Sequence, residues 1–351
     1  MVTKILKIDD NSTKYEAEIR YSADVIAKGG LVVFPTETVY GLGADATNAD
    51  AVKKIYIAKG RPSDNPLIIH IAQAYDAEKY AYTNDVFYRL ADKFMPGPLT
   101  IVLNAKDSVP MTTRGGLNTV AIRCPENKIA RALISASGVG IAAPSANLSG
   151  TPSPTSAEHV INDMNGRVDV IIDGGRCDFG LESTIVKIEK DGSLVLLRPG
   201  KITVEELLAV VNEVKLADSV TDKLKDGEVA LSPGMKYRHY APRASLVLVD
   251  ADALDYMNFV RDNLKKDIGV ISHTEFISDF SKFVDKERIF DFGSMESEII
   301  QANRLFDILR ETDKSDLSVI YAPLPKPVGI GLALYNRMIR AAAHKIVRLR
   351  R

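Results

Sequence analysis

The sequence predicts an α/β fold in two domains, and three observations support this prediction. The chain has 351 residues, more than one hydrophobic core usually organises. Short apolar runs alternate with segments of helical spacing over residues 1–210. After a stretch of weak periodicity, strand and helix alternate more regularly over about the last 100 residues. We therefore expect an N-terminal domain over residues 1–212, a linker or lid over 213–243 and a smaller C-terminal domain over 244–351.

In the N-terminal domain the predicted strands outnumber the predicted helices. This favours a twisted mixed sheet flanked by helices over a strictly parallel one. Several of the helices open with Asp, Ser or Thr, which cap helix N-termini. The predicted strands are residues 31–34, 67–70, 100–103, 119–123, 141–143, 170–173, 183–188 and 194–197, and the predicted helices are 21–28, 50–58, 85–94, 128–137, 156–164 and 203–211.

The C-terminal domain follows a stretch whose periodicity fades and which ends at Pro242. Its regular alternation predicts a Rossmann-like α/β domain. It contains no Gly-x-Gly-x-x-Gly motif, so we infer no dinucleotide there. The predicted strands are residues 246–249, 268–272, 288–292 and 317–321, with helices from about 252, over 296–310 and after 331.

Composition indicates a globular protein. Apolar residues make up 46% of the chain and charged residues 26%, and no apolar run approaches the roughly 20 residues that cross a bilayer. No secretory signal is recognisable, so we expect a cytoplasmic protein. Residues 1–210 carry 23 Lys and Arg against 25 Asp and Glu, which disfavours a basic nucleic-acid binder. Cys124 and Cys177 supply neither a disulfide framework nor a zinc pair, and we expect buried thiols.

Residues 59–70 carry the strongest local signal for a binding site. Lys59 and Arg61 follow a predicted helix, prolines at 62 and 66 prevent the helix from continuing, and an apolar strand then leads to His70. Fixed positive charge beside a rigid strand suits an anionic ligand. A charged surface turn before an ordinary core strand is the alternative.

Four further segments place small, hydroxyl or cationic residues at strand ends, where α/β sheets usually bind ligands. Residues 35–43 combine hydroxyls with glycines, which either contact a ligand or only reverse the chain. Residues 142–153 suit a backbone cradle for phosphate and ribose, or a plain surface loop. The third segment consists of residues 181–184 together with residues 198–200, which lie at the end of the following predicted strand.

The fourth segment is the apolar strand 119–123, which ends in an arginine. Thr119 and Arg123 are four residues apart, so on a strand both point to one face. Arg123 needs an anionic partner, and a substrate carboxylate or an internal Asp or Glu would serve equally. The sequence has no Gly-x-x-x-x-Gly-Lys-Ser/Thr, His-Glu-x-x-His or Gly-x-Ser-x-Gly motif, so phosphate chemistry would need another scaffold.

Together these segments resemble the YrdC-like family in its long, two-domain form. The Lys-x-Arg and Ser-x-Asn pairs of that family are present as Lys59, Arg61, Ser145 and Asn147. The runs PTETVYGLG, RPSDNPL, APSANLSG and SPGMKYRHYAP also match. The resemblance extends from about residue 5 to the C-terminus and implies a YrdC-like fold for the N-terminal domain.

The resemblance implies a nucleotidyltransferase that makes L-threonylcarbamoyl-AMP and pyrophosphate from L-threonine, bicarbonate or CO2, and ATP. The product would supply the threonylcarbamoyl group of N6-threonylcarbamoyladenosine at tRNA position 37. Hand-off to a tRNA threonylcarbamoyl transferase machinery is implied, without a need for direct tRNA binding. ATP would be a substrate accompanied by Mg²⁺, whose ligands the sequence does not identify.

The resemblance also implies two sets of site residues, matched position by position. The threonine pocket would consist of Thr36, His70, Arg123, Ala143 and Ser183. The ATP site would consist of Lys59, Arg61, Asn65, Thr119, Ser145, Asn147, Ser153, Arg198 and, from the linker, Tyr240.

These assignments are chemically consistent. Arg123 would hold the threonine carboxylate, and Thr36, His70 or Ser183 would read its hydroxyl. The substrate amine and then a carbamate oxygen are the nucleophiles, so catalysis rests on positioning and on cations around the phosphates. The carbamate is labile in water, and residues 232–242 are placed to act as a lid.

Two other function classes compete with this interpretation. A non-catalytic RNA-binding module would use the same cations for a phosphodiester backbone, but the basic residues are few and the domain is net negative. A relative that handles carbamoyl phosphate would carry zinc-finger or fused catalytic domains, which two isolated cysteines cannot supply.

Overall fold

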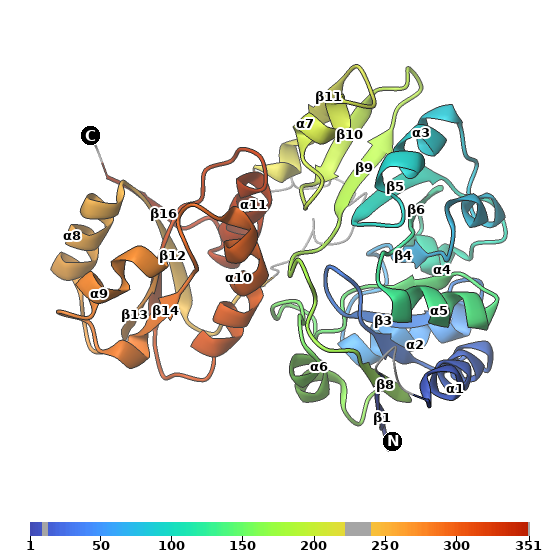
Figure 1. The fold of residues 1–351 in the computed structure, drawn as a ribbon, viewed down its shortest axis with the longest axis horizontal. Helices are drawn as coiled ribbons and strands as arrows, with labels where there is room; N and C mark the ends of the chain where they lie inside the picture. Colours follow the sequence, from blue (N-terminus) through green and yellow to red (C-terminus); the bar gives the residue numbers. More distant parts are fainter. Residues whose placement is uncertain (9–12, 222–239, 350–351) are drawn as a thin grey trace. The chain divides into compact units, whose positions relative to one another are not determined.

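A computed structural model describes residues 1–8, 13–221 and 240–349 of the chain (Figure 1). These residues divide into two compact units. The first contains residues 1–149 and 153–221, and the second contains residues 150–152 and 240–349. The predicted lid, residues 232–242, lies mostly outside the described residues.

The first unit is built on one sheet of eleven strands. Parallel pairs such as β4 with β6 and antiparallel pairs such as β5 with β6 both occur, which confirms the predicted mixed sheet. Across the sheet the strands are β1 (Lys4–Lys7), β8 (Val170–Asp173), β2 (Val32–Phe34), β3 (Gly41–Asp45), β7 (Ile141–Ala143), β4 (Ile68–His70), β6 (Thr119–Arg123), β5 (Leu99–Asn104), β9 (Thr184–Ile188), β10 (Leu194–Arg198) and β11 (Val214–Leu216).

Helices flank this sheet, and most begin with a side-chain cap. Ser156 and Thr203 cap as the sequence predicts, while Asn48, Asn84 and Asn127 accept hydrogen bonds from the first backbone N–H groups of three others. The helices are α1 (Tyr15–Ala27), α2 (Ala49–Lys59), α3 (Asp85–Phe94), α4 (Met111–Arg114), α5 (Lys128–Ser137), α6 (Ala157–Met164) and α7 (Val204–Leu208), with a 3₁₀ turn at Ala74–Lys79.

One hydrophobic core of the first unit lies between strands β1, β2 and β8 and helices α1 and α5. These two helices lie side by side in Figure 1. Ile26, Val32 and Ile172 are fully buried there. Burying an aliphatic side chain of this size contributes about 1.5–3 kcal/mol. This packing holds β2 in place, and the PTETVYGLG run follows β2 as a loop over residues 35–40 and the start of β3.

Three strands of the first unit depart from the prediction. The first is β1 at residues 4–7, which pairs in parallel with β8 where no strand was predicted. Residues 41–45 form β3 rather than a turn, because the glycines allow close packing: a Cβ atom on Gly43 would lie 2.8 Å from the Phe34 ring. Residues 214–216 form β11, which pairs in parallel with β10, although the sequence predicts a linker from residue 213. Three residues without a strong pattern are too short a signal for an edge strand.

The second unit has a five-stranded sheet in which every pair is parallel, as expected for a Rossmann-like domain. Among the described residues no helix is long and apolar enough to cross a membrane. The strands in order are β14 (Ile289–Asp291), β13 (Ile268–Ser272), β15 (Val319–Pro323), β12 (Ser245–Asp250) and β16 (Ile346–Arg348), and the helices are α8 (Ala253–Asn263), α9 (Ile277–Phe280), α10 (Glu298–Thr312) and α11 (Gly331–Ala341).

Candidate active site

Lys59 joins the two residue pairs on which the family resemblance rests. It is the last residue of α2, and Gly60 turns the chain there with a left-handed φ of 62°. The Lys59 ammonium donates hydrogen bonds to the backbone carbonyls of Ser145, at 2.5 Å, and Asn147, at 2.6 Å. Only 4% of Lys59 is exposed. A buried positive charge is thus fixed against the loop that follows β7.

Arg61 and Asn65 extend this cationic region. The Arg61 guanidinium Nη2 donates to the Asn65 carbonyl over 3.4 Å. The Asn65 side chain is fully buried, and neither its nitrogen nor its oxygen has a hydrogen-bond partner among the described residues. Leaving such an amide unpaired costs about 1–3 kcal/mol. A polar ligand would offset that cost.

His70 is the last residue of β4, and its imidazole is uncharged at neutral pH. Its Nδ1 lies 3.2 Å from the Ile68 carbonyl oxygen, and the Phe34 ring packs edge-on with centroids 5.9 Å apart. Burial, and next the positive charge of Arg123, lowers the His70 pKa to about 3. The neutral imidazole therefore offers hydrogen bonds to a ligand but no positive charge at neutral pH.

Arg123 lies directly across from His70 in the register of β4 and β6. Its Nη2 donates to Glu37 Oε1 at 2.7 Å, and both side chains are 4% exposed. Glu37 Oε2 also accepts the backbone N–H of Glu126 at 3.2 Å. An internal carboxylate, one of the two alternatives for Arg123, is thus present. The buried Arg123 Nε has no partner among the described residues, so a donor is left for a ligand.

Ser183 connects the two predicted sets of site residues. It immediately precedes β9, and Arg198 ends β10. Arg198 Nε donates to the Ser183 carbonyl at 3.0 Å, and Arg198 Nη2 donates to the Ser183 hydroxyl at 3.1 Å. The Thr100 hydroxyl lies 2.8 Å from the same Ser183 oxygen. Ser183, predicted to bind threonine, and Arg198, predicted to bind ATP, are therefore in direct contact.

Ser153, predicted for ATP, lies close to this contact. Its hydroxyl donates to Glu182 Oε1 at 2.6 Å, and both residues are buried. Ala143 is buried at the end of β7, where it pairs with Ile68 of β4. Thr119, by contrast, is half-buried at the start of β6, at the opposite end of that strand from Arg123.

Two residues predicted for the site, Thr36 and Tyr240, make contacts other than those expected. The Thr36 hydroxyl donates to the Val39 carbonyl at 2.6 Å and accepts the backbone N–H groups of Thr38 and Val39, both at 3.2 Å. Its hydrogen-bonding capacity is used inside the turn, which leaves its main chain for a ligand. Tyr240 belongs to the second unit, where its ring stacks on Phe306 with centroids 5.1 Å apart.

Sequence reasoning assigned no site role to Glu37, Thr100 or Glu182. All three are buried polar residues that hold a predicted site residue. The available signal was weak: a carboxylate inside a run of small and hydroxyl residues, or a hydroxyl in an otherwise apolar strand. Cys124 and Cys177 are buried as predicted, and burial raises the pKa of Cys124 to about 11.

The described residues contain no group of three or more His, Cys, Asp or Glu side chains that could hold a metal ion. Mg²⁺ is often bound through substrate phosphates with only one or two carboxylates. Such a mode fits this donor set, with Glu182 as a buried carboxylate in contact with Ser153.

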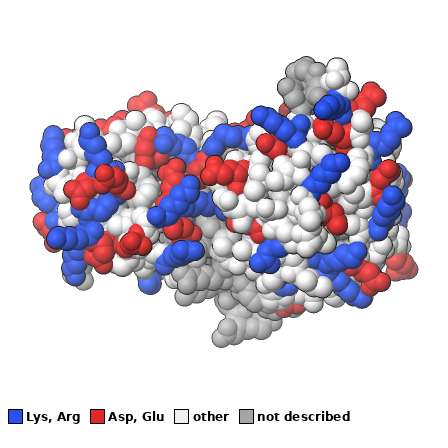
Figure 2. Space-filling view, turned by 90° about the horizontal axis from the view of Figure 1, so that it is seen from below, with Lys and Arg blue, Asp and Glu red and all other residues white. Residues whose placement is uncertain are grey.

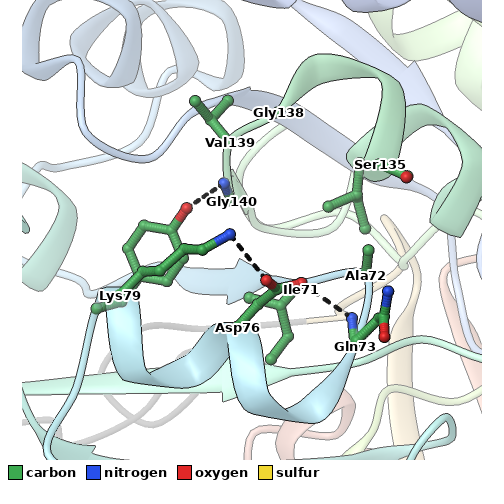
Figure 3. Close-up of a pocket in the computed structure, with 11 residues that line it drawn as sticks. Ile71, Ala72, Gln73, Asp76, Lys79, Ser135, Gly138, Val139 and Gly140 are labelled. Atoms are coloured by element: carbon green, nitrogen blue, oxygen red, sulfur yellow. Dashed lines mark hydrogen bonds and ion pairs between the residues drawn. The ribbon is translucent and has the colours of Figure 1, made fainter.

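A separate pocket lies between the end of β4 and the residues that precede β7 (Figure 3). Its charged residues pair with each other, since Lys79 Nζ lies 2.8 Å from Asp76. The Tyr80 hydroxyl accepts the Gly140 N–H at 2.5 Å. These polar groups already satisfy one another, so we assign no ligand to this pocket.

We predict strong energetic coupling between Glu37 and Arg123. Removing either partner leaves an uncompensated buried charge, so Glu37→Ala and Arg123→Ala should each lower the free energy of unfolding by about 3–5 kcal/mol. The double variant should lose much less than the sum. Urea unfolding of all four proteins measures this. The exposed pair Lys53 and Asp50 is the control and should show little coupling. Additive losses for Glu37 and Arg123 would contradict the prediction.

We predict that His70 makes the fold less stable as pH falls. Folding lowers the His70 pKa from 6.5 to about 3. Between these pH values the unfolded chain therefore binds a proton at His70, whereas the folded chain does not. Stability should fall by up to about 1.4 kcal/mol per pH unit from this group alone. Urea unfolding at several pH values, for the wild type and His70→Gln, measures the difference in slope. Equal slopes would rule out a neutral His70.

Comparisons with known proteins show the family to which this chain belongs. A family model described as telomere recombination, for Sua5, YciO and YrdC proteins, matches residues 24–200. A model described as threonylcarbamoyl-AMP synthase, C-terminal domain, matches residues 202–343.

Relatives match over almost their whole length. Threonylcarbamoyl-AMP synthase of Pyrococcus abyssi is 42% identical over 95% of this chain and 96% of its own. That of Bacillus subtilis is 40% identical over 97% of both chains. The structure of P. abyssi Sua5 complexed with L-threonine covers 100% of both chains with a TM-score of 0.90 and 40% identity. The chain therefore belongs to the Sua5, YciO and YrdC family, in the form that carries the threonylcarbamoyl-AMP synthase C-terminal domain.

Proposed function

We infer that this chain is a threonylcarbamoyl-AMP synthase, which forms L-threonylcarbamoyl-AMP and pyrophosphate from L-threonine, bicarbonate or CO2, and ATP. The observation that carries this conclusion is the Lys59 ammonium bound to the carbonyls of Ser145 and Asn147. It lies in a chain whose two halves both match the family. The relatives named above bear the same activity in their names.

We propose that L-threonine binds along the row of His70, Arg123 and Ser183, with the Ala143 and Thr36 main chains at its side. Arg123 donates to the substrate carboxylate through its unpaired Nε, while Glu37 accepts a hydrogen bond from the Nη2 of the same guanidinium. Neutral His70 offers a hydrogen bond without adding charge. The pocket thus offers a cationic donor for the carboxylate of the amino acid and neutral polar groups for its hydroxyl and amine.

We propose that ATP binds beside Lys59, Arg61, Asn65 and Arg198, with Ser145, Asn147, Ser153 and Thr119 completing the site within the first unit. The role of Tyr240 stays a prediction from the resemblance. The three cations are buried and hydrogen-bonded in the described structure, so they need little reorganisation to meet phosphate oxygens. Mg²⁺ would enter with the phosphates and neutralise part of their charge.

The reaction needs no protein nucleophile. The threonine amine forms an N–C bond with CO2 and loses a proton, which gives a carbamate. A carbamate oxygen then forms a bond to the α-phosphorus of ATP as the bond to the bridging oxygen breaks, and pyrophosphate leaves in line. The protein contributes orientation of the two substrates and electrostatic stabilisation of the phosphates.

The product is a mixed anhydride and would be handed to a tRNA threonylcarbamoyl transferase machinery for modification of position 37. We propose that this hand-off is direct, because an anhydride hydrolyses in water. A cytoplasmic location fits this role and stays a prediction.

The RNA-binding alternative has less support. Lys59, Arg61 and Arg198 are each less than 10% exposed, at 4%, 8% and 7%, which places them out of reach of a long phosphodiester backbone. Lys and Arg side chains are mixed with Asp and Glu over the face in Figure 2, rather than gathered in a basic stripe.

The proposed function predicts threonine-dependent pyrophosphate release. The full chain is incubated with Mg-ATP and bicarbonate, with and without L-threonine, and pyrophosphate is measured. Release should appear only with threonine, because the carbamate is the attacking group. Release that ignores threonine would contradict the synthase, and no release at all would favour a binding module.

We predict that the Asn65 side chain lowers the free energy of unfolding but strengthens ATP binding. Asn65→Leu replaces an unpaired buried amide by an apolar side chain of similar size, so the free energy of unfolding should stay equal or rise. ATP affinity should fall by about tenfold or more, the loss expected for one to two hydrogen bonds. Urea unfolding and calorimetric titration with ATP measure the two effects.

Asn84→Leu is the matched control for this test. Asn84 caps helix α3, so its loss should lower stability by about 1 kcal/mol while ATP affinity is unchanged. An Asn65→Leu variant that binds ATP like the wild type would remove Asn65 from the ATP site.

A further inference from the structure

Thr100 is a buried polar residue to which neither composition nor resemblance gives a role. It is the second residue of β5, whose other residues are apolar except for the exposed Asn104 at its end, and the exposed fraction of Thr100 is zero. Across the sheet it pairs with Arg123 on one side and Ile185 on the other. Paired residues of neighbouring strands place their side chains on the same face, so the Thr100 and Arg123 side chains share a face.

The Thr100 hydroxyl contacts one polar atom among the described residues, the Ser183 hydroxyl oxygen at 2.8 Å. A buried hydroxyl almost always finds an acceptor for its proton. Within this contact the acceptor is Ser183 Oγ. If Ser183 donated to Thr100 instead, the Thr100 proton would be buried without an acceptor, which is the less favourable arrangement.

Arg198 supplies a second hydrogen bond to the same oxygen. A guanidinium only donates, and Arg198 Nη2 lies 3.1 Å from Ser183 Oγ. A hydroxyl oxygen has two lone pairs, so Thr100 and Arg198 together fill both. The proton of Ser183 is then the only part of that hydroxyl left for another group.

We propose that Thr100 is a positioning residue that fixes the Ser183 hydroxyl as a hydrogen-bond donor toward the amino-acid substrate. This inference rests on the proposed function, because it takes Ser183 as part of the threonine pocket. The atom it meets must be an acceptor, which in threonine is a carboxylate oxygen or the side-chain oxygen. Two orienting contacts hold that donor before the substrate arrives, so less order is lost on binding.

Thr100→Val and Thr100→Ser test the proposal. Val keeps the shape and removes the hydroxyl, whereas Ser keeps the hydroxyl. Calorimetric titration should show the threonine Kd about fivefold higher in Thr100→Val, as expected for one lost orienting hydrogen bond. The ATP Kd should stay within about twofold, and Thr100→Ser should bind threonine within about twofold of the wild type.

A second set of variants separates orientation from general damage. Thr312→Val removes another buried threonine hydroxyl, one that bonds to the Leu309 carbonyl in the second unit. It should lower Tm as Thr100→Val does but leave the threonine Kd unchanged. In a Ser183→Ala background, Thr100→Val should have no further effect on the threonine Kd, because the group that it orients is gone.

Three outcomes would overturn the proposal. They are an unchanged threonine Kd in Thr100→Val, an equal loss of threonine and ATP affinity that Thr100→Ser does not restore, and an undiminished effect in the Ser183→Ala background. A wild-type chain that binds no threonine would overturn the proposed function as well. Wild-type binding with any of the three outcomes would overturn the role of Thr100 alone.

Discussion

The structure of the first unit depends on how it buries positive charge. Lys59, Arg123 and Arg198 lie at the ends of α2, β6 and β10, and each is less than 8% exposed. A buried cation is tolerated only when it is paired or hydrogen-bonded. Backbone carbonyls satisfy Lys59, the Glu37 carboxylate satisfies Arg123, and Ser183 contributes two acceptors to Arg198.

This way of satisfying the cations prepares the site for anions. Carbonyl and hydroxyl oxygens carry no full negative charge, so these contacts hold Lys59 and Arg198 without cancelling their positive charges as a carboxylate would. Arg123 differs, because Glu37 cancels its charge and only geometry and the Nε donor remain for a carboxylate. In the proposed site, Lys59 and Arg198 would suit nucleotide phosphates, and the Arg123–Glu37 pair would suit the carboxylate of threonine. Ligands that supply the missing hydrogen bonds would also stabilise the fold.

Much of this arrangement could be predicted from the sequence, and the failures have physical causes. The turn at Gly60 and the strand to His70 follow from local chemistry, and both were predicted. Strand β3 was missed because its glycines have low strand propensity, and their close packing against Phe34 and Ile141 depends on tertiary structure. Glu37 as the partner of Arg123 was left open, since the two are 86 positions apart and nothing local selects one carboxylate. Of the three residues predicted to read the threonine hydroxyl, Thr36 has a hydroxyl that its own turn already uses.

Sheet register explains why no single linear motif contains all residues of the proposed threonine pocket. Strands β4, β6, β5 and β9 are consecutive in the sheet, and His70, Arg123 and Thr100 occupy matched positions on the first three. Ser183 directly precedes β9, whose first residue pairs with Leu99. Neighbouring strands are about 4.8 Å apart, so three spacings, roughly 14 Å, collect residues that span more than 110 positions of sequence. A one-residue slip of β5 would turn Thr100 to the other face and leave Ser183 held by Arg198 alone. The chemistry of the site is therefore set by strand pairing as much as by the side chains themselves.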